Sequence, residues 1–286
     1  GPLVEGDLLN LFDIKQAITV HKPLAVMHLA SFIQVGESVK DPLKYYRNNI
    51  IGMVHLLEAM KEGEVPYMIF SSSAAVYGNP QTCPIDETHP CHPINPYGYT
   101  KLMIEQMLAD CCAAYGIQSV SLRYFNAAGA APAQGLGEAH DPETHLIPLM
   151  IQAAQKGEDA KPLRIFGCDY ETVDGTCLRD YIHVLDLADA HIKALDYLRQ
   201  GGKTLSLNLG SGEGTTNFEM IQHIEKLFTV KVRFDYAERR PGDAAKLVSS
   251  YQMAQNILGW QPCRNIEEIL KDAWKWHQDE NGKHDQ

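Results

Sequence analysis

Tyr97 and Lys101 stand four residues apart in a stretch that is typical of a helix start. Pro96 disfavours a helical conformation for Asn95 and suits the first turn of a helix that Gly116 would end. Residues at positions i and i+4 lie one above the other on the same helix face. The tyrosine hydroxyl has an ordinary pKa of about 10. A cation one helical turn away favours its deprotonated form. The pair can act as a proton acceptor, although a core tyrosine beside a surface lysine has the same spacing.

Ser73 follows an apolar stretch that begins at Val65, and we predict that this stretch is a strand. In a parallel sheet the carboxyl ends of the strands face the ligand crevice. A serine hydroxyl at that edge, together with Tyr97 and Lys101 on the next helix, makes a three-membered group that can transfer a proton. We therefore predict that Ser73, Tyr97 and Lys101 are catalytic.

The composition is that of a globular protein with an acidic surface. Of the 286 residues, 45% are hydrophobic and 21% are charged, and the formal net charge is -11. This charge argues against a general nucleic-acid or acidic-membrane surface. No apolar run approaches the ~20 residues that a transmembrane helix needs. The seven cysteines form no Cys-x-x-Cys pair, which favours reduced thiols and a cytoplasmic protein over disulfides or zinc.

Residues 65–78 and 95–101 are similar to motifs of the extended short-chain dehydrogenase/reductase family, and within it to those of sugar-nucleotide epimerases. The resemblance extends from Val4 to Trp260. It implies an α/β fold with a Rossmann-like doubly wound parallel sheet and a smaller mixed α/β substrate lobe. The division that it implies is a partial NAD-binding domain of residues 1–127 and 181–211, and a substrate lobe of residues 128–180 and 212–286 whose closing helix 266–276 returns to the first domain.

The family's Gly-x-x-Gly-x-x-Gly turn does not occur in the sequence. In the family this turn lets the dinucleotide's diphosphate approach a helix N-terminus. The resemblance therefore implies a chain that lacks the first βαβ unit and looks truncated at its N-terminus. Because a parallel strand would then face an unpaired sheet edge, we expect the isolated chain to be weakly stable or to borrow pairing from a neighbour.

The resemblance implies NAD as the cofactor and assigns residues to it. Asn48 falls on the first asparagine of a Tyr-Tyr-x-Asn-Asn segment, in a helix that Asp41 and Pro42 open. The residues implied to bind NAD are Asp7, Leu8, Leu29, Ala30, Asn48, Tyr97, Lys101 and Tyr124.

The substrate residues come from a second set of segments. Arg179 and Arg240 lie far apart in turn-like segments of an acidic chain, and guanidinium groups match phosphate oxygens. Two separate surface ion pairs would explain these arginines equally well without the resemblance. The residues implied to bind a nucleotide-sugar are Asn126, Leu146, Phe166, Arg179, Arg240 and Asp243.

The resemblance implies reversible inversion at sugar C4 of UDP-glucose and UDP-galactose, through a transient 4-keto intermediate and tightly bound NAD. It also implies a homodimer. A sugar-nucleotide 4,6-dehydratase fits less well, since Ser73 is followed by Ala74 and Ala75. Two alternatives remain open. One is an epimerase for N-acetylated UDP-sugars, because Leu247 falls at the position that filters the acetamido group; the other is an inactive fragment that keeps only a UDP-sugar site.

Three further features suggest chemistry that we do not expect. His140 and His145 flank a proline and lack the helical spacing of a zinc protease, so we predict no metal site. His183 lies in a strand-like stretch and is expected to be a packed core residue. Gly210–Gly214 does not match a dinucleotide fingerprint, and a capping box of Thr216 and Glu219 starts the helix behind it.

Overall fold

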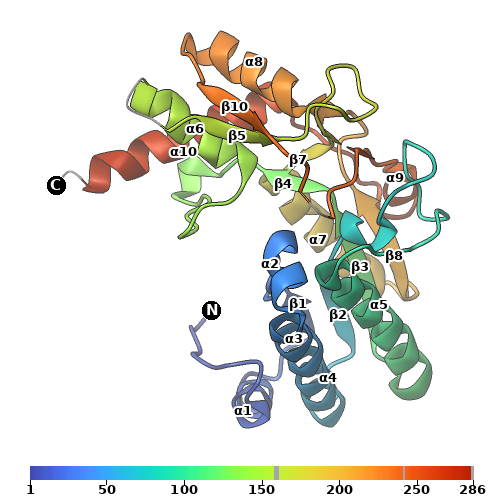
Figure 1. The fold of residues 1–286 in the computed structure, drawn as a ribbon. Coiled ribbons are helices and arrows are strands. Elements are labelled where there is room, and N and C mark those ends of the chain that lie inside the picture. The colour runs from blue at the N-terminus through green and yellow to red at the C-terminus, as the bar shows by residue number, and fades with distance from the viewer. Residues whose placement is uncertain (158–160, 241, 285–286) are drawn as a thin grey trace.

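The computed structural model describes residues 1–157, 161–240 and 242–284. Figure 1 shows two parts, one built on a parallel sheet and one on several short sheets. The elements of the first half of the chain are α1 (Leu11–His21), β1 (Ala25–His28), α2 (Val35–Lys40), α3 (Pro42–Tyr45), η1 (Tyr46–Ile51), α4 (Gly52–Glu62), β2 (Tyr67–Ser73), η2 (Ala74–Tyr77), α5 (Pro96–Tyr115), β3 (Gln118–Tyr124), β4 (Asn126–Ala128) and η3 (Pro132–Gln134). Those of the second half are α6 (Leu146–Lys156), β5 (Leu163–Phe166), β6 (Leu178–Arg179), β7 (Tyr181–His183), α7 (Val184–Arg199), β8 (Leu205–Leu209), β9 (Thr215–Thr216), α8 (Asn217–Phe228), β10 (Phe234–Ala237), β11 (Lys246–Leu247), α9 (Gln252–Leu258) and α10 (Ile266–His284).

The central sheet has the strand order β1-β2-β3-β8, and all of its neighbouring strands run parallel. Alternate residues of β2 face opposite sides, as the geometry of a strand requires. Met68 and Phe70 pack with α1, α4 and α5, whereas Ile69 packs with α7, α9 and β8. Helices therefore cover both faces of the sheet, which confirms the predicted Rossmann-like α/β architecture.

Strand β1 is shorter and more exposed than a buried strand would be. In the described sheet it pairs only with β2. Met27 is 41% exposed, and Leu24 and Leu29 on either side of the strand are more exposed still. The apolar run around β1 correctly indicated a strand, but at the edge of the described sheet Met27, Leu24 and Leu29 remain in contact with solvent.

Helix α5 begins and ends where the sequence predicts. The side chain of Asn95 accepts a hydrogen bond from Gly98 N at 2.8 Å, and Gly116 ends the helix in the left-handed conformation with φ 75°. A β-carbon on Gly98 would lie 2.5 Å from the carbonyl oxygen of Ala75. The glycine after Tyr97 thus lets the first turn of α5 pack directly on η2, the turn that follows Ser73.

The helix that Asp41 and Pro42 open is also confirmed. Asp41 accepts a hydrogen bond from Lys44 N at 3.2 Å, and Pro42 is its first residue. The chain then widens into a π-helical segment, η1, before it continues as α4. Single π-helical turns inside α-helices are frequent at functional sites. This one contains Asn48, the residue assigned to NAD.

A buried carboxylate ties α5 to the central sheet. Glu105 accepts two hydrogen bonds from Arg123 on β3, at 3.0 and 2.6 Å, and one from Ser72 on β2 at 2.5 Å. Ser206 on β8 donates a fourth at 3.3 Å. The side chains of Glu105 and Arg123 are both 8% exposed. The remaining guanidinium nitrogen of Arg123 donates to the hydroxyl of Tyr77 at 2.7 Å, so every strong donor in this network has an acceptor.

The second part of the molecule has its own apolar core. Helices α6, α8 and α10 pack around the parallel pair β5 and β10, with Met150, Ile151, Met220 and Leu270 fully buried among them. The capping box of Thr216 and Glu219 at the start of α8 is confirmed. The predicted closing helix is present and continues past residue 276 to His284. The proposed boundaries of the two domains stay a prediction.

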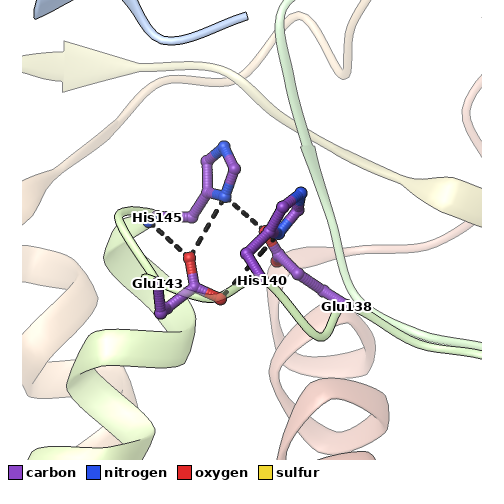
Figure 2. Close-up of side chains that lie close together, drawn as sticks. All are labelled: Glu138, His140, Glu143 and His145. Atoms are coloured by element: carbon purple, nitrogen blue, oxygen red, sulfur yellow. Dashed lines mark hydrogen bonds and ion pairs between the residues drawn. The ribbon is translucent and has the colours of Figure 1, made fainter. Parts of the chain in front are cut away.

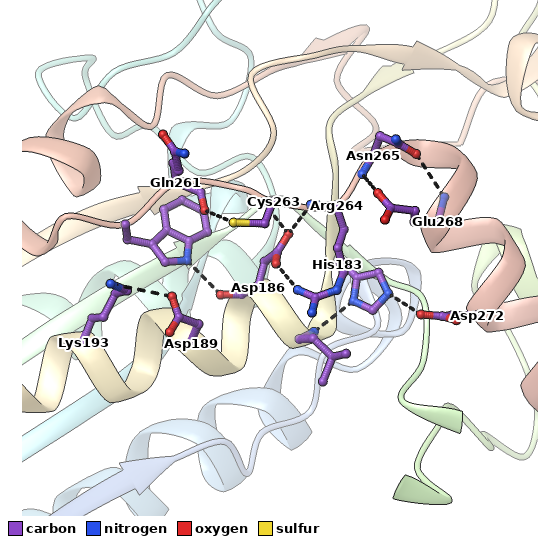
Figure 3. Close-up of polar contacts among 12 residues, drawn as sticks. His183, Asp186, Asp189, Lys193, Gln261, Cys263, Arg264, Asn265, Glu268 and Asp272 are labelled. Atoms are coloured by element: carbon purple, nitrogen blue, oxygen red, sulfur yellow. Dashed lines mark hydrogen bonds and ion pairs between the residues drawn. The ribbon is translucent and has the colours of Figure 1, made fainter. Parts of the chain in front are cut away.

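Two polar contacts anchor the C-terminal segment to the start of α7 (Figure 3). Asp186 pairs with the guanidinium of Arg264 and accepts hydrogen bonds from Cys263 N and Arg264 N at 3.0 Å each. His183, which is fully buried, accepts a hydrogen bond from Leu185 N and contacts Asp272 on α10 at 3.2 Å. This is the structural role that the sequence predicts for His183.

The network around Glu105 yields a stability prediction. In Glu105→Gln, the Arg123 guanidinium stays buried without its counter-charge, so we expect the free energy of unfolding to fall by about 3–5 kcal/mol. Urea unfolding followed by circular dichroism measures this loss. The matched control is Glu62→Gln, which removes the exposed pair with Lys15 and should cost under about 1 kcal/mol. Equal losses in the two variants would contradict the role given to Glu105.

Candidate active site

The fold brings the three predicted catalytic residues to the carboxyl end of β2. Ser73 is the last residue of β2, and its hydroxyl accepts a hydrogen bond from Ala75 N at 3.1 Å. Tyr97 and Lys101 extend from the first two turns of α5, which pack on η2 and β2. Tyr97 is 9% exposed and Lys101 is 2% exposed. The arrangement is therefore a largely dehydrated group of one hydroxyl, one phenol and one amine.

Lys101 lies in a pocket that disfavours its charge. Its Nζ donates a hydrogen bond to the carbonyl oxygen of Ser71 at 2.8 Å and lies 5.0 Å from the centre of the Phe70 ring. Burial lowers the pKa of Lys101 to about 7, and the charge of Glu105 only partly opposes that shift. Burial together with Lys101 also lowers the pKa of His28, on the adjacent strand β1, to about 4. Lys101 therefore titrates close to neutral pH.

The pKa of Tyr97 shifts in the direction opposite to our prediction from the sequence. Burial raises the pKa of Tyr97 above its ordinary value, and a hydrogen bond with Ser73 only partly opposes the rise. The Lys101 ammonium lies 5.7 Å from the centre of the tyrosine ring, and its own charge is reduced by burial. The helical spacing placed the two residues correctly, but removal of water outweighs the attraction of the neighbouring cation.

The residues assigned to NAD divide into two places. Tyr124 ends β3 beside Ser71, and its hydroxyl contacts Ser71 Oγ at 3.0 Å and His191 Nε2 at 2.5 Å. Asn48 is half-buried in η1 and donates to Asn49 Oδ1 at 3.1 Å. These residues belong to the elements that surround Lys101.

The remaining residues assigned to NAD lie along the β1 side of the sheet. Leu29 and Ala30 directly follow β1 and are exposed. Asp7 is exposed and accepts a hydrogen bond from Leu9 N at 2.9 Å, while the carbonyl oxygen of Leu8 contacts His55 Nδ1 at 3.1 Å. Because His28 is opposite Phe70 in the parallel pair of β1 and β2, Leu29 and Ala30 lie at the same carboxyl edge of the sheet as the end of β2.

The donors near Lys101 suit the nicotinamide riboside half of NAD. Within the described part of the chain, Lys101 donates one hydrogen bond and so does Asn48, which leaves further N–H groups on each for ribose hydroxyls. These residues therefore fit the nicotinamide riboside half of NAD.

Three of the predicted substrate residues meet in the second part of the molecule. The guanidinium of Arg240 lies 4.6 Å from the centre of the Phe166 ring, and its Nε donates to Asp243 at 3.1 Å. The Arg240 side chain remains 55% exposed, so it is accessible to a ligand. An aromatic ring, a guanidinium and a carboxylate can contact the base, the phosphate and the ribose of a nucleotide respectively.

Arg179 lies on the strand next to this group. Its strand β6 pairs with β11, where Arg179 is opposite Leu247. Its Nη1 donates to the carbonyl oxygens of Leu178 at 3.0 Å and Ala245 at 3.5 Å. The sequence left open a separate ion pair for each of the two arginines. Among the described residues, Arg240 pairs with Asp243, whereas Arg179 forms no ion pair with a carboxylate.

Asn126 and Leu146 line one cavity. It also includes Gly129, Pro148 and Tyr181, and its wall continues to Glu138 and His145. Asn126 N donates to the carbonyl oxygen of Asp180, and Asn126 is opposite Tyr181 in the pair of β4 and β7, so it lies beside the segment that contains Arg179. The side chains of Asn126 and Leu146 are both half-buried.

The sequence argument missed residues that position the site. Glu105 follows Lys101 by four residues on α5, which is the spacing of a helical ion pair and was visible in the sequence. Asn49 is buried and binds both main-chain groups of Phe32, at 3.0 and 3.1 Å, as well as Thr100 Oγ1 at 3.1 Å. It joins η1 to α5, a role that no local pattern indicates.

Comparison with known proteins agrees with this geometry. Residues 2–210 match the model of the NAD dependent epimerase/dehydratase family. A UDP-glucose 4-epimerase of Rhizobium leguminosarum bv. trifolii is 48% identical over 281 residues, which are 98% of this chain and 85% of that protein.

Two solved structures are similar in fold as well as in sequence. One is UDP-glucose 4-epimerase from Brucella ovis in complex with NAD, with a TM-score of 0.91 and 46% identity over 96% of this chain and 84% of the other. The second is UDP-glucose 4-epimerase from Bifidobacterium longum in complex with NAD+ and UDP, with a TM-score of 0.92 and 35% identity over 97% and 83% of the two chains. The chain belongs to the NAD dependent epimerase/dehydratase family.

Proposed function

We propose that this chain catalyses the reversible epimerisation of UDP-glucose and UDP-galactose at sugar C4, with NAD as its cofactor. The observation that supports this most directly is the group formed by half-buried Ser73 and buried Tyr97 and Lys101 at the carboxyl edge of the parallel sheet. The similarity to UDP-glucose 4-epimerases over 98% of the chain supports the choice of substrate.

The proposed proton transfer uses Tyr97 and Ser73. The Tyr97 oxygen accepts the proton of the C4 hydroxyl as the hydride leaves C4, and a 4-keto sugar results. The Ser73 hydroxyl bridges the sugar hydroxyl and the phenol by hydrogen bonds. Bound NAD would accept the hydride and return it, and its positively charged ring would favour the Tyr97 phenolate that burial disfavours. Lys101 and Asn48 would hold the nicotinamide ribose through their remaining N–H groups.

Arg179, Arg240 and Asp243 would keep the nucleotide bound while the ketose turns over. Guanidinium groups on opposite sides of a diphosphate hold it by charge-assisted hydrogen bonds. Phe166, over which Arg240 already lies, offers a ring for the uracil base. With the nucleotide fixed, the 4-keto sugar can present its other face. Return of the hydride to C4 on that face, with return of the proton from Tyr97 to the C4 oxygen, would complete the inversion.

We also propose that the protein acts in the cytoplasm and forms a homodimer. Among the residues that the structure describes, every helix is too short or too polar to span a lipid bilayer. All seven cysteines are free, which supports action in the cytoplasm. Apolar side chains exposed on neighbouring helices support a homodimer; these are Leu43, Ile51, Val54, Tyr99 and Met103.

The first test of this function changes the proton acceptor. Tyr97→Phe should lower conversion of UDP-galactose to UDP-glucose, measured with added NAD, by at least about 100-fold, because it removes the group that accepts the proton. UDP affinity should be nearly unchanged. Tyr99→Phe, on the same helix but 46% exposed, is the matched control and should retain full conversion. If the Tyr97→Phe variant converts UDP-galactose as fast as the unaltered chain, Tyr97 is not the catalytic proton acceptor. If the unaltered chain binds UDP but shows no conversion, the chain is better explained as an inactive fragment with a UDP-sugar site.

A second test concerns the protonation of Lys101. Its folded-state pKa of about 7 lies below the ordinary value, so the unfolded chain binds more protons between these two values and stability rises with pH there. The Lys101→Met variant has no ionisable group at this position, so its stability lacks this pH dependence. We therefore expect the free energy of unfolding of the unaltered chain, compared with that of the variant, to increase by about 2 kcal/mol between about pH 7.5 and about pH 9.

Urea unfolding of both proteins at the two pH values measures this gain. Lys226→Met, which replaces an exposed lysine on α8, is the control, and its difference from the unaltered chain should stay constant. A constant difference for Lys101→Met as well would mean that Lys101 is not held near neutrality.

The third test concerns the nucleotide. Arg240→Ala should weaken binding of UDP by about 1.5–3 kcal/mol, the range for hydrogen bonds to charged groups. Isothermal titration calorimetry with UDP measures the dissociation constant. Arg239→Ala is the matched control, because Arg239 pairs instead with Asp169 at 2.7 Å and lies over the Tyr170 ring. Equal affinities in Arg240→Ala and the unaltered chain would rule out the phosphate contact.

A further inference from the structure

Four side chains with metal-binding atoms converge in the loop before α6 (Figure 2). Glu138, His140, Glu143 and His145 each offer one ligand atom, and these atoms all lie within 4.8 Å of one another. Both imidazole rings turn Nδ1 toward the carboxylates: His140 Nδ1 lies 3.0 Å from Glu138 and His145 Nδ1 lies 3.3 Å from Glu143. We call these four residues the His–Glu cluster.

The two carboxylates of the His–Glu cluster converge on one nitrogen atom. His145 Nδ1 is shielded from solvent, pairs closely with Glu138 and lies 3.3 Å from Glu143. A cation bound between this nitrogen and the two carboxylates would offset the two adjacent negative charges.

The spacing of the ligand atoms suits a small cation. Zinc–nitrogen and zinc–oxygen bonds of about 2.0–2.2 Å in a tetrahedron place neighbouring ligand atoms about 3.3–3.5 Å apart. His140 Nδ1 lies 3.0 Å from Glu138 and 4.0 Å from Glu143 Oε2, on both sides of that value, whereas the contact between His145 Nδ1 and Glu138 is shorter than it. Only small movements of the side chains would therefore be needed to form a four-coordinate site.

The surrounding structure holds the loop in place from two sides. Glu143 accepts hydrogen bonds from Thr144 N at 2.6 Å and His145 N at 2.7 Å, which leaves its second oxygen for a ligand. Trp276 on α10 donates from its indole nitrogen to the carbonyl oxygen of Glu138 at 2.8 Å. Gly137 lies against the same indole, where a β-carbon would approach the ring to 2.2 Å. The ligands are thus supported by contacts outside the His–Glu cluster.

We propose that the His–Glu cluster binds a zinc ion. Two imidazole nitrogens and two carboxylate oxygens, with no thiolate, form a ligand set that suits Zn2+ and not the all-oxygen sites of Mg2+ or Ca2+. Our sequence argument against a metal considered only the spacing of the two histidines on a helix; the structure forms the site from a loop and adds Glu138. The ion would fix the chain at His145, directly before Leu146 in the cavity that also contains Asn126.

The test uses the full chain without an affinity tag, stripped of metal by a chelator and with its cysteines alkylated. Calorimetric titration with ZnCl2 should show one ion bound per chain. His140→Ala removes a ligand whose ring is 48% exposed and whose recorded contacts lie within the His–Glu cluster. Loss of a ligand's supporting partner alone costs 10–100-fold in metal affinity, so we expect at least about 100-fold weaker binding for loss of the ligand itself. Glu138→Gln should behave similarly.

His21→Ala is the matched control, because it removes an exposed histidine at the end of α1 and should leave the titration unchanged. Circular dichroism of each variant verifies that the fold is retained. Co2+ provides a second readout, since a four-coordinate site gives visible absorption that Zn2+ abolishes by competition. Absence of a stoichiometric Zn2+ site in the unaltered chain, or equal affinity in His140→Ala and His21→Ala, would overturn the proposal and identify the His–Glu cluster as ion pairs alone. Neither result depends on epimerase activity.

Discussion

Glu105 is the residue on which the geometry of the candidate active site depends, because its carboxylate joins one helix to three strands. It accepts hydrogen bonds from Ser72 on β2, Arg123 on β3 and Ser206 on β8. Lys101 and Tyr97 precede it by four and eight residues on α5, about one and two helical turns. A rotation or shift of α5 would break these charge-assisted bonds in a dry environment, where an unpaired charge is most costly. The Glu105 contacts therefore fix the distance from Tyr97 and Lys101 to Ser73.

The same burial that fixes the site also determines its protonation. Without a ligand, burial favours a neutral Tyr97 and brings Lys101 close to its titration point at neutral pH. A neutral phenol is a poor proton acceptor. In the proposed reaction the missing positive charge comes with the cofactor, so the tyrosine becomes reactive only in the complete complex. Such coupling limits proton transfer to the moment when a hydride acceptor is present.

The second part of the molecule contributes binding in place of proton transfer. Arg240, Phe166 and Asp243 contact one another on different segments, and β6 places Arg179 beside the same region. Glu138 and His145 of the His–Glu cluster line the cavity that also contains Asn126 and Leu146. A zinc ion there would stabilise the loop that leads to Leu146, which links the proposed metal site to substrate binding by position and leaves the chemistry to Tyr97.

Local sequence determined much of the architecture. The bounds of α5 follow from Pro96 and Gly116, the start of α3 from Asp41, and the strand β2 from its continuous apolar run. The motif resemblance supplied the family and the residues to examine. These features depend on backbone preferences and on contacts within a few residues, so they can be predicted from neighbouring positions in the chain.

Only the tertiary structure decided the properties that depend on burial and on distant contacts. The rise in the pKa of Tyr97 reflects water removed by several packed elements, whereas the sequence showed only the cation four residues away. The bond between Glu105 and Arg123 and the approach of Glu138 to His145 join positions whose side-chain directions no local pattern sets. Removal of water and contacts between distant residues of the chain act through space. The sequence therefore predicted the positions of the reactive groups but not their protonation states.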